Sequence, residues 1–138
     1  MTGKKFKEAE LLLRIYALYS SDPMVDAFTW FYKDFQVVDL QDYNNRYPLG
    51  SEGRKYFNRL ANLFDLLGIF IERKYITKKL IIEFCPDDVK SFWEKSKLLI
   101  SQMRSKWNDP TLWVGLETLN RSIINWEEKL KKQKRVSL

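Results

Sequence analysis

Four polar side chains share one face of the segment that we expect to be the most apolar helix of the chain. They lie at spacings of four, three and seven residues, so on an α-helix they form a single stripe. The four are Asn58, Asn62, Asp65 and Glu72. Such a stripe can line a groove for a small ligand or a partner. It can equally face solvent, or form an interhelical hydrogen-bond network that fixes the packing register.

The chain has few residues suited to catalysis, because it contains no histidine and a single cysteine. The usual general base and the usual zinc or iron ligand are therefore both missing. Cys85 lies between Phe84 and Pro86, and these apolar neighbours favour a neutral, structural thiol. Asp87 and Asp88 are adjacent, so on a helix they do not face one another as an acid and base would. We expect no catalytic residue, no metal site, no cofactor and no enzyme.

Positive charge is concentrated near the two ends of the sequence. The formal net charge is +6, from 24 lysines and arginines against 18 acidic residues. Residues 1–7 contribute three lysines and residues 129–138 contribute five cations, with no acidic residue in either stretch, so the rest of the chain carries −2. A basic run of this kind either completes a solvated helix end or acts as an electrostatic arm for phosphate backbones or anionic lipid. The C-terminal cations are Lys129, Lys131, Lys132, Lys134 and Arg135.

Apolar residues recur every three or four positions along most of the chain, which predicts helices. Only 5 glycines and 4 prolines are present, too few for the many tight turns of an all-β domain. The predicted helices cover approximately residues 7–20, 22–42, 51–74, 77–84, 86–107 and 109–130. We therefore expect an all-α fold: one compact domain of about five or six helices, bundle-like or in an orthogonal array. Short basic extensions, 1–7 and 129–138, flank it, and we expect the second to fray.

Two of these helices have features that bear on packing. The helix over 51–74 carries two apolar stripes, so neighbouring helices must cover it on two sides. The last helix, opened by Asp109 and Pro110, has a heptad seam. Trp113 and Ile124 lie off that seam, and we expect them to leave apolar surface for a second copy or another protein.

Residues 56–76 read YFNRLANLFDLLGIFIERKYI, and a short helix and the pair Phe92 and Trp93 follow them. This pattern resembles an uncharacterised helical family, domain of unknown function 4760. The resemblance covers the middle half of the chain and leaves the first helices outside it. It implies a helical fold and no known activity, and it brings no functional residues with it.

The sequence therefore favours a non-enzymatic helical interaction module, regulatory or scaffolding, that acts through a protein partner or self-association. The alternative is a nucleic-acid-associated protein whose basic termini bind the phosphate backbone. No stretch reaches the roughly 18 apolar residues that a membrane span needs, and the N-terminus lacks a signal-like pattern. With a single cysteine, an internal disulfide is excluded, so we expect a cytoplasmic protein without a membrane span.

Overall fold

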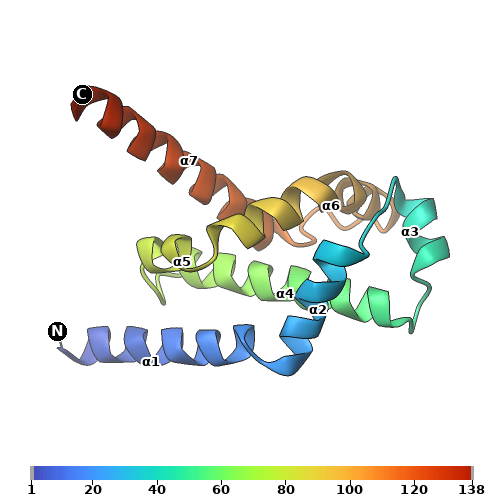
Figure 1. The fold of residues 1–138 in the computed structure, drawn as a ribbon, viewed down its shortest axis with the longest axis horizontal. Helices are drawn as coiled ribbons and strands as arrows, with labels where there is room; N and C mark the ends of the chain where they lie inside the picture. The colour runs from blue at the N-terminus through green and yellow to red at the C-terminus, as the bar shows by residue number, and fades with distance from the viewer. Residues whose placement is uncertain (1, 138) are drawn as a thin grey trace.

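The computed structural model describes residues 2–137, and this part of the chain contains seven α-helices and no strand (Figure 1). The predicted all-α fold is confirmed, with one helix more than the expected five or six. The helices are α1 (Thr2–Tyr19), α2 (Asp22–Lys33), α3 (Leu40–Arg46), α4 (Glu52–Glu72), α5 (Lys78–Phe84), α6 (Pro86–Lys106) and α7 (Val114–Ser137).

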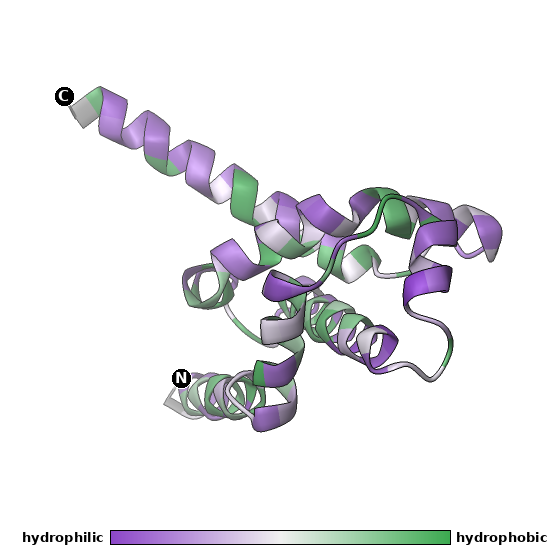
Figure 2. Cartoon of the chain, turned by 45° about the vertical axis from the view of Figure 1, so that its right-hand side comes forward, coloured by the Kyte–Doolittle hydropathy of each residue, from purple (hydrophilic) through white to green (hydrophobic). Residues whose placement is uncertain are grey.

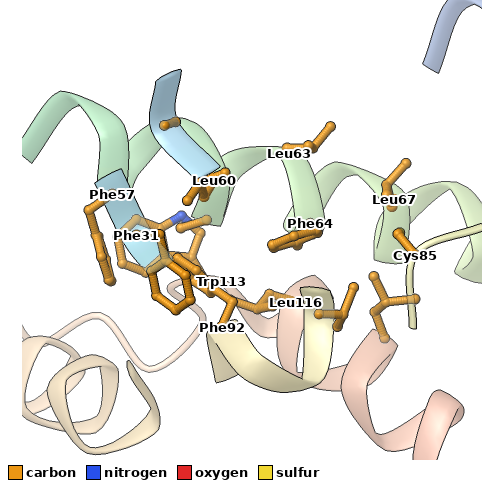
Figure 3. Packing of buried hydrophobic residues seen from close by; sticks show 14 of the residues in the cluster. Phe31, Phe57, Leu60, Leu63, Phe64, Leu67, Cys85, Phe92, Trp113 and Leu116 are labelled. Atoms are coloured by element: carbon orange, nitrogen blue, oxygen red, sulfur yellow. The ribbon is translucent and has the colours of Figure 1, made fainter. Parts of the chain in front are cut away.

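Helix α4 is the centre of the fold. It packs most extensively against α7 on one side and α2 on the other, as its two apolar stripes predict. Phe57, Leu60, Phe64 and Leu67 are completely buried. Their aromatic neighbours come from α2 and α6: the ring of Phe92 lies 5.1 Å from those of both Phe31 and Phe57 (Figure 3). Aromatic rings at this separation add stabilisation beyond the area that they bury.

Glycine is required where α4 and α7 cross. A Cβ atom on Gly68 would overlap the carbonyl group of Gly115, and one on Gly115 would lie 2.5 Å from the carbonyl oxygen of Asp65. The two backbones therefore touch directly. This close approach fixes the position of α7 along α4.

The predicted helix over 22–42 is interrupted, which accounts for the additional helix. Helix α2 ends at Lys33, and α3 begins after Asp39, whose carboxylate accepts a hydrogen bond from the backbone N–H of Asp42 at 2.8 Å. The intervening Val37 and Val38 are β-branched and suit a non-helical connection. A capping aspartate after two β-branched residues indicates a break followed by a new helix. The continuous apolar periodicity over 22–42 hid this signal.

The last helix begins at Val114, so the prediction that Asp109 and Pro110 open it is wrong. Residues 109–113 form turns instead, with a hydrogen bond from the N–H of Leu112 to the carbonyl of Asp109 at 3.3 Å. Asn108 and Trp113 both have φ of 52°, in the left-handed region. This reversal lets α7 fold back across α4.

Both terminal stretches continue as helix. Residues 3–7 belong to α1, and α7 remains helical through Ser137, whereas the sequence suggested a fraying extension; Met1 and Leu138 lie outside the described residues. In Figures 1 and 2 the last turns of α7 project away from the body, and Figure 2 shows that they are largely hydrophilic. The heptad seam is buried at Leu116, Leu119 and Ile123, but Leu130 is 41% exposed.

Candidate functional site

Two residues of the polar stripe on α4 hold α7 in place. The amide oxygen of Asn62 accepts a hydrogen bond from the indole N–H of Trp113 at 2.9 Å. The Oδ1 atom of Asp65 accepts one from the backbone N–H of Leu116 at 3.2 Å. That N–H belongs to the first turn of α7, where donors lack an intrahelical partner and a carboxylate is electrostatically favourable. Asn62 and Asp65 thus form an interhelical hydrogen-bond network.

The other two members of the stripe do not join them. Asn58 and Glu72 are exposed and take no part in these contacts. The four side chains therefore do not act as one polar wall.

The two residues expected to expose apolar surface on the last helix are in different environments. Trp113 is only 8% exposed, and its ring lies 5.6 Å from that of Phe57 (Figure 3). Its left-handed backbone turns the indole into the core, so the expectation that Trp113 leaves free surface is corrected. Ile124 is 40% exposed and borders a hollow between α6 and α7 that Lys90 and Asn120 also line.

A single carboxylate joins α1, α2 and α6. The hydroxyl groups of Tyr19 and Tyr32 both donate hydrogen bonds to Asp88. Burial, and then the hydrogen bond to Asp88, raises the pKa of each tyrosine. Cys85 lies nearby, and burial raises the pKa of its thiol to about 12, so almost none of it is the reactive thiolate at neutral pH. This cluster joins three helices through the carboxylate of Asp88.

The outer face of α1 is a feature that the sequence reasoning missed. Ile15 faces the core, yet Phe6 is 72% exposed, Leu13 69% and Tyr16 58%. With the exposed Ala9 between them, these residues recur at spacings of three, four and three. Such a spacing is typical of the apolar seam between two paired helices. In the sequence it forms a second apolar stripe on α1, beside the stripe that contacts the core. We call Phe6, Ala9, Leu13 and Tyr16 the outer stripe.

The basic termini, distant in sequence, lie at the same end of the molecule. In Figure 1 the start of α1, the α4–α5 connection and the end of α7 are all on the left. Two hollows open there, and Lys78 lines both. We call this region the basic end. The sequence showed these cations but could not show that Lys129 and Lys132 border a hollow beside Lys78, whereas Lys131, Lys134 and Arg135 line neither hollow.

Within residues 2–137 no group of three or more histidine, cysteine, aspartate or glutamate side chains is arranged to hold a metal ion. No helix in the same range has the length and apolar character to cross a membrane.

This arrangement is an all-helical domain built around one central helix. The model of the family described as domain of unknown function (DUF4760) matches residues 6–126, and the chain belongs to that family. The match includes α1 and α2, so the expectation that the resemblance stops at the middle half was too narrow. No curated protein and no solved structure matches the chain significantly.

Proposed function

We propose that this protein is a cytoplasmic, non-enzymatic interaction module, regulatory or scaffolding, that pairs with a second copy of itself through the outer stripe of α1. The observation that supports this proposal is the row of exposed apolar side chains on a helix whose opposite face is already buried. Single exposed apolar residues are ordinary on a protein surface. A contiguous stripe indicates a docking surface. The free, buried thiol of Cys85 suits a reducing compartment.

The outer stripe is complementary to itself. If two α1 helices pack antiparallel about a two-fold axis, Phe6 of each copy lies opposite Tyr16 of the other, and Ala9 lies opposite Leu13. Each large aliphatic side chain then faces a small one, and the aromatic rings pair at the two ends. A two-fold dimer needs this kind of self-complementarity, because one surface must serve both copies.

The charges beside the stripe do not oppose such pairing. Glu10 and Arg14 flank it and already form an ion pair within α1, with 3.6 Å between their charged atoms. This pair therefore adds no net charge beside the centre of the stripe. A dimer would remove exposed apolar area from water on both copies, at roughly 25 cal/mol for each Å².

Sedimentation velocity over a range of concentrations tests the proposal. We expect the wild-type chain to shift from monomer to dimer as concentration rises, and Leu13→Arg to remain monomeric, since it places a charge in the centre of the seam. Val136→Arg is the matched control, because Val136 is 88% exposed on α7 and lies outside the stripe. This control should dimerise like the wild type.

Two results would overturn self-pairing. One is a wild-type chain that remains monomeric at every concentration. The other is a dimer that Leu13→Arg and Val136→Arg leave equally intact. Circular dichroism of each variant shows whether the helical fold is retained.

A further inference from the structure

Three segments that are far apart in the sequence meet at the basic end. The carboxylate of Glu8 on α1 accepts hydrogen bonds from both the backbone N–H and the hydroxyl of Thr77, each at 2.5 Å, which ties α1 to the start of α5. The end of α7 borders the same region through Lys78. Lys78 is therefore common to two hollows, one bordered by the cations of α1 and the other by those of α7.

The first hollow is rich in unpaired positive charge. It has a volume of about 440 Å³ and lies between α1 and the α4–α5 connection, with Ile71 and Ile76 among its lining. Its single carboxylate, Glu8, is occupied by Thr77, and the pKa of Glu8 is lowered by the hydrogen bonds to Thr77 and by nearby lysines. Four ammonium groups border it, from Lys4, Lys5, Lys74 and Lys78. The hollow thus has a formal excess of three positive charges.

The second hollow places an aromatic ring beside lysines. Its volume is about 290 Å³, and Trp126 on α7 forms part of its wall together with Lys78, Lys129 and Lys132. Asn125, Ser122 and Glu128 complete the lining, so the second hollow has three lysines, one carboxylate and a formal excess of two positive charges. A partly exposed indole between cations is the arrangement on which an unpaired base stacks while lysines contact the adjoining phosphates.

Seven of the described cations elsewhere on the surface form ion pairs with acidic side chains. For example, the Nζ atom of Lys90 lies 2.7 Å from the carboxylate of Glu127, and the Nη1 atom of Arg104 lies 2.8 Å from the carboxylate of Glu117. Among the described residues, no ion pair involves any of the six lysines that line the two hollows. What distinguishes this end is that six such lysines border two hollows that share Lys78, and this concentration of charge complements a ligand that carries several negative charges.

We infer that the basic end binds single-stranded nucleic acid, with phosphates in the first hollow, an unpaired base against Trp126 in the second, and Lys78 contacting the backbone between them. Exposed base faces are what an indole recognises, and a duplex hides them. Phosphate neutralisation by lysine makes the affinity fall as salt concentration rises. This site uses a different surface from the outer stripe of α1.

Fluorescence anisotropy of a labelled oligothymidine, titrated with the full chain at low and moderate salt, tests the inference. We expect salt-sensitive binding, weakened about tenfold by Lys78→Glu, because the charge change lies where both hollows meet. Trp126→Leu should weaken binding while leaving the salt dependence unchanged, because it removes stacking without removing a charge. Lys55→Glu is the matched control: it makes the same charge change at an exposed position on the first turns of α4, outside both hollows, and should bind almost like the wild type.

Several outcomes would overturn the inference: no binding at low salt, equal affinity for a duplex of the same length, equal weakening by Lys78→Glu and Lys55→Glu, or no effect of Trp126→Leu. Tighter binding to phosphatidylserine vesicles, or competition by pyrophosphate as effective as competition by oligothymidine, would point to a lipid surface or a small phosphate ligand instead. Leu13→Arg should bind oligothymidine normally, so this test and the test of self-pairing can fail separately.

Discussion

Helices α4 and α1 are both long and both carry more apolar residues than a single buried stripe requires. On α4 the two stripes are covered from two sides, by α2 and by α7, and Phe57 and Leu67 are fully buried. On α1 one stripe is covered, and the other, containing Leu13, faces solvent. The apolar pattern thus shows how many faces a helix offers, and it does not show whether the covering helix belongs to the same chain.

The two helices also differ in how firmly the rest of the fold holds them. Helix α4 contacts α2, α5 and α7 through its length, and its crossing with α7 leaves no room for a side chain at Gly68. Helix α1 is held by Ile15 in the core, by aromatic contacts of Tyr16 and Tyr19 with α2 and α5, and by the hydrogen bonds of Tyr19 and Glu8. Segments with few buried contacts open at lower free energy than the core does. We therefore expect α1 to detach before α4 unfolds.

The largest predicted effect is at the crossing of α4 and α7. Gly115→Ala should lower the free energy of unfolding by about 3 kcal/mol, because its methyl group would press on the backbone of Asp65. Urea unfolding followed by circular dichroism measures this. Gly3→Ala is the control, because a Cβ atom there meets nothing within 4 Å and alanine favours a helix. A loss below about 1 kcal/mol at Gly115 would show that the crossing can relax.

The two faces of α1 give a smaller and more direct contrast. Ile15→Ala should cost about 2 kcal/mol in dilute protein, since it removes buried volume. Leu13→Ala, two residues away, should cost less than about 0.5 kcal/mol under the same conditions, because its side chain is already in water. At high protein concentration the Leu13→Ala variant should have a lower free energy of unfolding than the wild type, because dimerisation stabilises only the wild type. Equal costs in dilute protein would contradict the assignment of inner and outer faces.

The smallest effect concerns the Tyr19 hydroxyl and appears most clearly in alkali. Burial and the hydrogen bond to Asp88 raise the pKa of Tyr19 above the usual value of about 10, so the folded state retains the proton more strongly than the unfolded state. The stabilisation is complete below pH of about 10 and is lost as the pH rises beyond it. Tyr19→Phe should cost about 1 kcal/mol at neutral pH and should reduce this alkaline loss.

Unfolding free energies measured from neutral pH into alkali, with tyrosinate absorbance as the second observable, check the Tyr19 prediction. Tyr75→Phe provides the control, because Tyr75 is 55% exposed. Identical pH profiles for the two variants would show that Tyr19 contributes nothing to the docking of α1.

The regular parts of the fold were predictable because helical periodicity and capping act locally. The two stripes of α4 were predicted from the sequence, and the structure covers both of them. Ser51 capping α4 and the acidic start and basic end of α6 are local signals of the same kind. The start of α7 was not evident, because an aspartate before a proline can begin either a helix or a turn. The direction of Trp113 was also hidden, since it depends on a left-handed backbone that tryptophan rarely adopts.

The candidate surfaces were harder to predict because they depend on which segments meet. The sequence showed lysines at both ends, but their convergence on Lys78 follows from the direction in which α7 crosses α4. Likewise Asn62 and Asp65 looked the same as Asn58 and Glu72 until α7 was placed over two of the four. The pair that bonds to the last helix and its preceding turn is therefore distinguished from the exposed pair by tertiary contacts and not by residue type.

The projecting end of α7 does not have to nucleate its own helix. A helix of this length alone in water is marginal, because its first turn fixes several dihedral angles for a single hydrogen bond. Here the buried half of α7, with Leu119 and Ile123 in the core, supplies that turn, so the cationic half only has to propagate it. Each residue then advances by about 1.5 Å, which presents Lys129 and Arg135 about 9 Å apart along the axis. The core thereby sets the spacing of charges that lie beyond it.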